Sequence, residues 1–217
     1  SPTLRADITS NLVLHYTFDN ITAGVIPDAS GNSKDATVYG AASAVAGYSG
    51  QAINMTTPTD YVQLPNDINS SLVDYTVACW VKLSTVDRAP VDYDNYWGRI
   101  FDFGNGTSTN MFLCPKNGYP YYAIKANDTQ GEQSVSSTTK LVADKWHHMA
   151  ITCAFDQTSG TGTLIMYIDG TPVGKNAAVT ITPSAMGTTL QNYIGKSQYA
   201  DPSIYGSIDD FRVYSRA

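Results

Sequence analysis

Glutamate is almost absent from this sequence of 217 residues: Glu132 is the only one, against eighteen aspartates. Hydrolysis of a glycosidic bond needs two carboxylic acids, one acting as general acid and the other as nucleophile or base. Glu132 stands in a turn-like Gly-Glu-Gln-Ser context, without an acidic neighbour at strand spacing. We therefore expect no pair of catalytic glutamates, and no enzymatic activity, in this chain.

Charge is scarce as well, since only 15% of residues are charged and the net charge is -6. A chain that binds nucleic acid normally carries a clustered basic face, so this balance argues against nucleic acid as a partner. No uninterrupted apolar run reaches about eighteen residues, which argues against membrane insertion. The polar surface is supplied instead by Ser, Thr, Asn, Gln and Tyr, which offer neutral hydrogen bonds and flat rings suited to neutral sugars.

Cysteine is limited to Cys79, Cys114 and Cys153. Without a Cys-x-x-Cys pair, a cysteine metal site is not expected. Cys79 and Cys153 fall in strongly apolar strand patterns, where a small thiol packs well. Three reduced thiols are the simplest interpretation, and a Cys79–Cys153 disulfide is the alternative.

A sustained helical period is also missing, whereas strand patterns recur along the chain. Apolar and polar residues alternate over 12–19, and further strands are expected at 36–39, 51–54, 61–64, 75–83, 99–103, 110–113, 119–126, 146–155, 163–168, 191–196 and 206–215. The segment 75–83 is nearly continuous in apolar residues and should be central. Asp169 and Gly170 predict a two-residue hairpin turn. About a dozen strands with frequent turns indicate an all-β, two-sheet antiparallel sandwich.

The first and last strands are expected to pair, which would bring Asp19 close to Asp209. Asp209 has the parity of the apolar Phe211 and Val213, and a carboxylate in such a row needs a counter-charge or a metal. Calcium takes six to eight oxygen ligands from carboxylates, amides and main-chain carbonyls.

The candidate calcium ligands are Asp19, Asp28, Asn32 and Asp209, and Asp210, of opposite parity, is the weaker candidate. The alternative is that these side chains only cap turns and meet Arg212 or Lys34.

Aromatic and polar residues gather in two irregular segments, 87–97 and 197–205. Sugar rings stack their C–H faces on Tyr or Trp, and their hydroxyls bond to amides and carboxylates at the rim. Tyr121 of the segment 119–126 is added to these two segments. The candidate carbohydrate-binding residues are Tyr93, Asn95, Tyr96, Trp97, Tyr121, Tyr199, Asp201 and Tyr205. The alternative for any single Tyr is an ordinary half-exposed strand residue.

Two other patterns are interpreted as structural. Trp80 and Trp146 lie within apolar strand patterns and are expected to pack in the core. His147 and His148 are neighbours in a strand, so they should point to opposite faces and cannot act together on one ligand.

Seven motifs, in this order, resemble those of laminin-G-like jelly-roll domains of the concanavalin A-like lectin and glucanase superfamily: Tyr16-Thr-Phe-Asp, Asp28-Ala-Ser-Gly-Asn, Tyr75-Thr-Val-Ala-Cys-Trp-Val-Lys, Arg99-Ile-Phe-Asp-Phe-Gly, Trp146-His-His-Met-Ala-Ile-Thr, Tyr167-Ile-Asp-Gly and Ile208-Asp-Asp-Phe-Arg-Val-Tyr. The resemblance runs from about residue 12 to 214 and implies a jelly-roll fold. It also implies a structural calcium beside the closing strand, with Asp209 as a ligand. Glucanases of the superfamily use a Glu-x-Asp-x-x-Glu motif, which one glutamate cannot supply.

The resulting hypothesis is one domain over residues 1–217, excised from a larger secreted or cell-surface protein. It would be a non-catalytic carbohydrate-binding module that targets a covalently linked glycoside hydrolase or related enzyme to a polysaccharide or oligosaccharide. The alternatives are a protein-binding or adhesion module and a structural spacer that braces a catalytic domain. A sequence of this kind specifies the fold more closely than the ligand.

Overall fold

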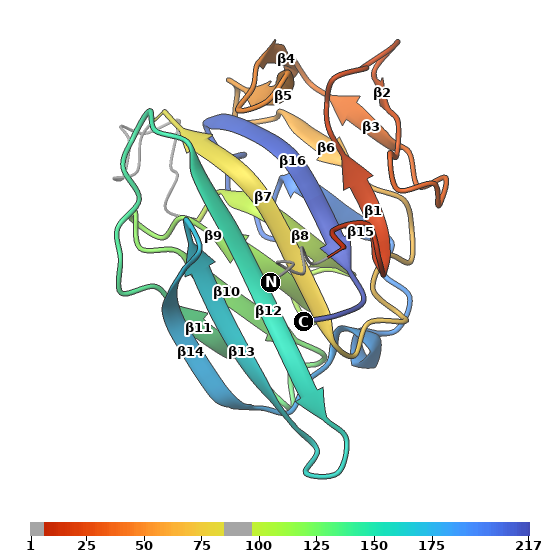
Figure 1. Cartoon of the computed structure of the whole chain (residues 1–217), viewed down its shortest axis with the longest axis vertical. Helices are drawn as coiled ribbons and strands as arrows, with labels where there is room; N and C mark the ends of the chain where they lie inside the picture. Colours follow the sequence, from red (N-terminus) through yellow and green to blue (C-terminus); the bar gives the residue numbers. More distant parts are fainter. Residues whose placement is uncertain (1–6, 85–96) are drawn as a thin grey trace, which may run out of the picture.

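Two antiparallel β-sheets of eight strands each stack face to face in the computed structural model, which describes residues 7–84 and 97–217 (Figure 1). Sheet A contains β1 (Leu12–Tyr16), β4 (Ser43–Ala46), β5 (Gln51–Met55), β7 (Tyr75–Leu83), β12 (His147–Asp156), β13 (Thr161–Ile168), β14 (Thr171–Val179) and β16 (Gly206–Tyr214). Sheet B contains β2 (Val25–Ile26), β3 (Ala36–Tyr39), β6 (Tyr61–Gln63), β8 (Arg99–Gly104), β9 (Asn110–Cys114), β10 (Tyr121–Lys125), β11 (Gln133–Ser136) and β15 (Gln191–Gly195). The predicted two-sheet antiparallel sandwich is confirmed.

The strand order of sheet A is β14-β13-β12-β7-β16-β5-β4, so β7 is central as predicted. Sheet B runs β11-β10-β9-β8-β15-β6-β3-β2. Strands β2, β4 and β11 and the 3-10 helix η1 (Pro183–Met186) were not predicted. Segments of two to four residues show little period, although the equally short β3 and β6 were expected correctly. Over the described ranges no helix is long and apolar enough to cross a membrane.

The hairpin between β13 and β14 has the predicted turn. Asp169 and Gly170 both adopt positive φ, at 51° and 78°, and Ile168 pairs with Thr171 across them. Positive φ at both central residues matches the right-handed twist of the two strands.

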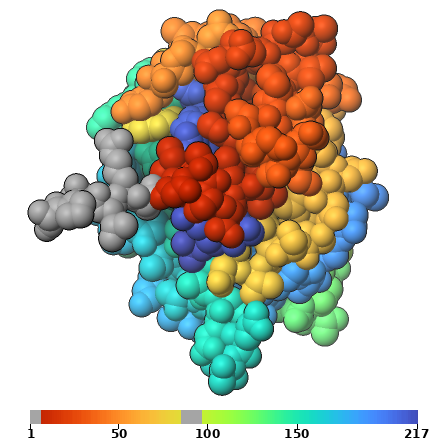
Figure 2. Space-filling view, turned by 45° about the vertical axis from the view of Figure 1, so that its right-hand side comes forward, coloured from red at the N-terminus to blue at the C-terminus, as the bar shows by residue number. Residues whose placement is uncertain are grey.

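The first and last strands lie side by side, as the sequence predicted. Strand β1 pairs antiparallel with β16, with Leu12 opposite Tyr214 and Tyr16 opposite Phe211. Beyond the strand, the Tyr214 hydroxyl donates a hydrogen bond to the carbonyl of Ile8 (3.0 Å). Figure 2 shows the first described residues, in red, against the C-terminal strand, in blue.

A β-bulge in β16 corrects the predicted orientation of Asp209. Opposite β7, Asp209 pairs with Trp80 and Arg212 with Ala78, so two residues of β16 face one of β7, and Asp210 takes φ of 49°. The extra residue changes the parity of the strand. Asp209 therefore lies on the outer face of sheet A beside Trp80, whereas Phe211 and Val213 stay in the core; the predicted shared face was wrong.

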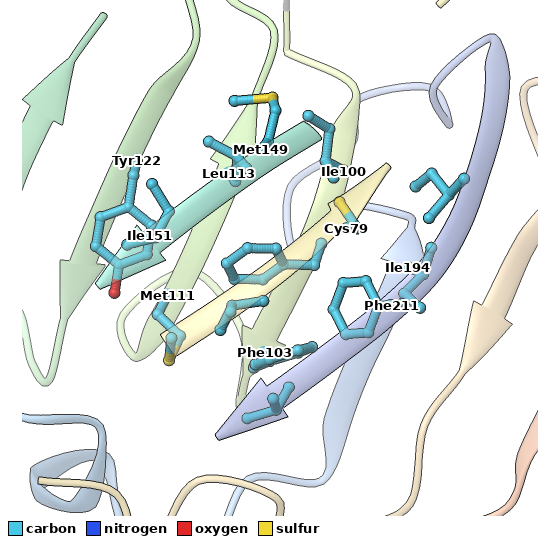
Figure 3. Packing of buried hydrophobic residues seen from close by; sticks show 14 of the residues in the cluster. Cys79, Ile100, Phe103, Met111, Leu113, Tyr122, Met149, Ile151, Ile194 and Phe211 are labelled. Carbon is cyan, nitrogen blue, oxygen red and sulfur yellow. The ribbon is translucent and has the colours of Figure 1, made fainter. Parts of the chain in front are cut away.

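The core between the sheets is aromatic and sulfur-rich (Figure 3). Phe101, Phe103 and Phe211 contact one another with ring centroids 4.9 to 6.3 Å apart. The buried hydroxyls of Tyr75 and Tyr122 lie 2.6 Å apart and hydrogen bond to each other across the core. Such a pair satisfies two polar groups that would otherwise be costly to bury.

All three cysteines are buried free thiols. On neighbouring strands Cys79 pairs with Met149 and Cys153 with Tyr75, so the register keeps the two sulfurs apart and the alternative disulfide is absent. Burial raises the pKa of Cys153 to about 11 and that of Cys114 to about 12, which keeps both thiols protonated at neutral pH.

Trp80 and Trp146 are half-buried and lie outside the core between the sheets, contrary to expectation. The Trp80 ring stacks on Tyr48 (centroids 3.4 Å apart, 11°) and meets His148 edge-on, all on the outer face of sheet A. His147 points the other way and its Nδ1 lies 2.8 Å from Asp169, so the predicted divergence of the two histidines is confirmed.

Candidate functional site

The outer face of sheet B carries a pocket of about 280 Å³. Its walls come from the start of β8, from β9 and β10, from the residue before β11 and from the loop 196–205 between β15 and β16. The lining residues are Trp97, Arg99, Phe112, Tyr121, Glu132, Tyr199 and Asp201.

Strand alternation explains the apolar floor. Ala123 lies opposite Phe112 and Tyr121 opposite Cys114, which places all four on one face of β9 and β10. Together with Trp97 they form a second apolar cluster, separate from the core between the sheets. β9 is therefore buried on both faces, and its outward residues support the pocket instead of the core.

A buried arginine organises the pocket. Arg99 is 2% exposed, and its Nε donates to Oδ2 of Asp102 (3.2 Å) while its Nη2 lies 3.4 Å from Oδ2 of Asp201. Its Nη1 donates to the carbonyl of Trp97. The planar guanidinium thus links β8, the residues before it and the loop 196–205.

Three rings surround that guanidinium. Its Cζ lies 4.0 Å from the ring centroid of Phe112, 5.7 Å from that of Tyr199 and 5.9 Å from that of Trp97. These are distances at which a cation is attracted to an aromatic face. Trp97 meets Tyr121 edge-on, with centroids 6.3 Å apart, so the rings are held in place before any ligand arrives.

Asp102 lies beneath Arg99 and is fully buried. Its Oδ2 also accepts the main-chain N–H of Gln198 (3.0 Å), whereas its Oδ1 has no hydrogen-bond partner among the described residues. Burial raises the pKa of this carboxyl to about 7, and the Arg99 charge opposes part of that rise.

Hydrogen bonds hold the loop 196–205 against the sheet. The Ser197 hydroxyl donates to Asp201 (2.9 Å) and accepts the N–H of Tyr199 (3.0 Å), whose own hydroxyl donates to the carbonyl of Thr107 (3.2 Å). The side-chain amide of Gln198 accepts from the turn between β8 and β9 (2.8 Å) and donates to β15 (2.6 Å). Tyr199 and Asp201 are thereby preorganised at the pocket.

Glu132 closes the rim of the pocket. Its carboxylate accepts the hydroxyl of Tyr121, whose pKa burial raises to about 12, so that the phenol stays protonated at neutral pH. The Lys116 ammonium lies 3.9 Å above the Tyr121 ring. The pocket therefore offers aromatic faces for stacking and the oxygens of Asp201 and Glu132 as acceptors for hydroxyl groups.

Four of the predicted carbohydrate-binding residues lie together in this pocket: Trp97, Tyr121, Tyr199 and Asp201. Tyr205 does not line the pocket. Three more predicted residues, Tyr93, Asn95 and Tyr96, fall in 85–96, outside the described residues.

Arg99, Phe112 and Glu132 were missed. Arg99 and Phe112 carry no local signal, because both read as ordinary strand residues. Glu132 was considered only as evidence against a pair of catalytic glutamates, not as a binding residue.

Two of the predicted metal ligands meet elsewhere. Asp19 and Asp209 line a pocket of about 220 Å³ beside β16, together with His15, Asp210 and Arg212. Asp210 is engaged there by His15 and Arg212, so it is not free to bind a metal. Oδ1 of Asp19 accepts the N–H of Gln51 (2.7 Å), and Oδ2 of Asp209 accepts that of Ser49 (3.0 Å). Burial raises the pKa of Asp209.

The turn between β4 and β5 fits closely against these carboxylates. A Cβ at Gly50 would collide with Asp19, and one at Gly47 would collide with Asp209, so glycine is needed at both positions. Main-chain groups of this turn thus lie next to both carboxylates.

Asp28 and Asn32 do not join this pocket. The oxygens of Asp28 accept four hydrogen bonds, from the N–H groups of His15, Ser30 and Lys34 and from the Ser30 hydroxyl. The Asn32 amide donates to two carbonyls of β1. Across residues 7–84 and 97–217, no group of three or more His, Cys, Asp and Glu is arranged to hold a metal ion.

Several solved structures with the same fold are described as binding domains, and another is described as a sialidase. The binding domain of Paraclostridial Mosquitocidal Protein 1 aligns with a TM-score of 0.69 at 15% identity, over 96% of this chain and 50% of that one. A structure of botulinum neurotoxin type C, whose cell entry depends on interaction with two ganglioside molecules, aligns with a TM-score of 0.66 at 14% identity. That alignment covers 97% of this chain and 49% of the other. The chain thus spans about half the length of these relatives.

For one smaller relative, the alignment covers most of that relative's length. The CBM40 domain of the Ruminococcus gnavus IT-sialidase, bound to α2,3-sialyllactose, gives a TM-score of 0.56 at 14% identity, over 76% of this chain and 90% of that one. At such identities the likeness shows the fold alone. No curated protein sequence matches the chain.

The family assignment comes from the sequence model of the concanavalin A-like lectin/glucanases superfamily, which matches residues 56–217, well over half of the chain. That range includes β6 to β16 and every described residue of the aromatic pocket. The chain belongs to the concanavalin A-like lectin/glucanases superfamily.

Proposed function

We propose that this chain is a non-catalytic carbohydrate-binding module whose ligand occupies the pocket of Trp97, Tyr121 and Tyr199. The observation that carries the proposal is the convergence of these three rings with the Asp201 carboxylate in one preorganised pocket. The relatives support it, because one is described with gangliosides and another with α2,3-sialyllactose, and both ligands contain sugars.

A sugar would stack a C–H face on the rings and donate its hydroxyl hydrogens to Asp201 and Glu132. The pocket is open and of modest volume, so we expect dissociation constants between micromolar and millimolar, or about -4 to -8 kcal/mol. In its cellular setting we propose an extracellular module, linked to a glycoside hydrolase or related enzyme, that holds the catalytic domain on its substrate.

Glycan binding is tested by isothermal titration of the isolated chain against a panel of soluble polysaccharides and oligosaccharides. Tyr199→Ala and Trp97→Ala should each weaken binding at least about tenfold, because each removes a stacking face from a preorganised site. Tyr48→Ala is the matched control and should leave affinity unchanged, since Tyr48 is an exposed ring in the turn between β4 and β5, stacked on Trp80 of sheet A.

Absence of binding across the panel would contradict this function. That result would favour the alternative functions, a protein-binding module or a structural spacer. Hydrolysis of any glycan by the isolated chain would contradict the non-catalytic part of the proposal.

We also propose a structural calcium ion at Asp19 and Asp209. The two carboxylates supply oxygen ligands of the kind calcium takes, and a glycine-containing turn packs closely against both. With fewer than three acidic ligands in place, main-chain carbonyls and water would complete the coordination. The ion would hold the turn between β4 and β5 against both chain-end strands.

Calcium at a hundredfold excess over its dissociation constant should stabilise the fold by about 3 kcal/mol and raise the melting temperature by about 5 °C or more relative to chelator. Asp209→Asn should abolish that difference, whereas Asp67→Asn, at an exposed aspartate, should retain it. Equal melting temperatures of the unmodified chain with calcium and with chelator would refute the calcium proposal.

A further inference from the structure

A second pocket adjoins the first on the same face of sheet B. It has a volume of about 260 Å³ and shares Tyr199 and Asp201 with the aromatic pocket. The residues that it adds include Tyr61 of β6, and Lys196 and Ser203 of the loop 196–205. Because Tyr199 and Asp201 line both pockets, a ligand that contacts them can extend into either side.

The second pocket has its own aromatic wall. Tyr61 stacks on Tyr39, with ring centroids 4.8 Å apart and an interplanar angle of 6°, and meets Tyr193 edge-on at 5.5 Å. The Lys196 ammonium lies 4.3 Å from the centroid of Tyr61 and 4.8 Å from that of Tyr193. Both rings therefore attract the ammonium and hold it at the wall of the pocket.

The two pockets differ in charge. In the first, Arg99 is the only cation among the described lining residues; it is already bonded to Asp102 and lies near Asp201, and Glu132 adds another carboxylate. The Lys116 ammonium does not line this pocket and lies over the rings of Tyr121 and Trp97. In the second, Asp201 is likewise engaged by Arg99 and by the Ser197 hydroxyl. Lys196 forms no ion pair with any described residue, so its charge is available to a ligand.

An unpaired ammonium in a partly desolvated aromatic wall favours an anion, and its interaction with one is stronger there than in open water. The rest of the chain is acidic, with a net charge of -6, so it does not attract anions nonspecifically. The specificity for an acidic group would therefore come from Lys196 itself.

We propose that the two pockets form one groove for an oligosaccharide that carries an acidic group. A neutral ring would stack in the first pocket, and a neighbouring residue bearing a carboxylate or sulfate would lie against Tyr61 with its charge on Lys196. This inference rests on the proposed function and narrows its ligand class from glycans in general to acidic oligosaccharides.

The test is an array of matched glycan pairs, each neutral oligosaccharide printed beside counterparts that carry a sialic acid, a uronic acid or a sulfate. The unmodified chain should bind at least one acidic member about tenfold more tightly than its neutral partner. Carboxylated and sulfated members separate a preference for an acidic sugar ring from a preference for charge alone.

Lys196→Gln should remove this preference without weakening binding to the neutral partners, and Lys196→Arg should retain most of it. Lys82→Gln is the control, because that ammonium lies over Trp146 instead of at either pocket. Tyr199→Ala should weaken binding to both members of each pair, since Tyr199 lines both pockets.

Equal binding of neutral and acidic partners by the unmodified chain would overturn this inference. So would an acidic preference that survives in Lys196→Gln. If Tyr199→Ala still weakened binding to both partners in that case, the proposed function would stand. No binding to any glycan on the array would instead contradict the proposed function, and this inference with it.

Discussion

Replacing Arg99 by Met should lower the free energy of unfolding by about 3–5 kcal/mol, because it leaves the buried Asp102 without its counter-charge. Asp102 is fully buried, and one of its oxygens is already without a partner among the described residues. The change also removes the group around which Trp97, Phe112 and Tyr199 are arranged, so glycan binding should be lost as well. Urea denaturation at pH 8, where Asp102 is mostly ionised, measures the stability effect.

The double variant Arg99→Met/Asp102→Leu separates the charge effect from the loss of packing. Removing both charges should recover most of the stability, since replacing a buried pair by apolar residues is often nearly neutral. Glycan binding should remain weak in the double variant, because Asp201 loses its contact with the guanidinium. A loss below about 1 kcal/mol in the single variant would mean that the pair does not hold the site together.

Asp102 should also make the stability of the protein fall as the pH rises from about 4 to about 7. Its pKa is about 7 in the folded chain and near its ordinary value of 3.8 in the unfolded chain. Between these values the folded state holds a proton that the unfolded state has released, so raising the pH favours unfolding. A shift of this size amounts to about 2–4 kcal/mol between pH 4 and pH 8.

The measurement compares urea denaturation of the unmodified chain and of Asp102→Asn at pH 5 and pH 8. The comparison cancels the other carboxyls, several of which have lowered pKa values and act in the opposite direction. The unmodified chain should lose stability relative to the variant as the pH rises. Parallel pH profiles would show that Asp102 stays ionised throughout.

The sequence by itself determined the fold, because the features that specify it are local. Alternation along residues 12–19 and the apolar run 75–83 identified β1 and the central β7, and Asp169 with Gly170 identified the hairpin. The matched patterns of the first and last strands were enough to predict their pairing. Composition also named the residue types of the pocket, since Trp97, Tyr121, Tyr199 and Asp201 were all candidates.

Only the tertiary structure decided which of those candidates meet and what joins them. Strand order brings β8, β9 and β10 beside the loop 196–205, and no local pattern records that Arg99 lies between Phe112 and Tyr199. The bulge at Asp210 is likewise invisible to a period of two, although it alone turns Asp209 to the outer face. Alternation assigns a residue to a face only within an unbroken strand. Burial and the partners of a charge depend instead on segments that are distant in sequence, which is why the groove appears only in the folded chain.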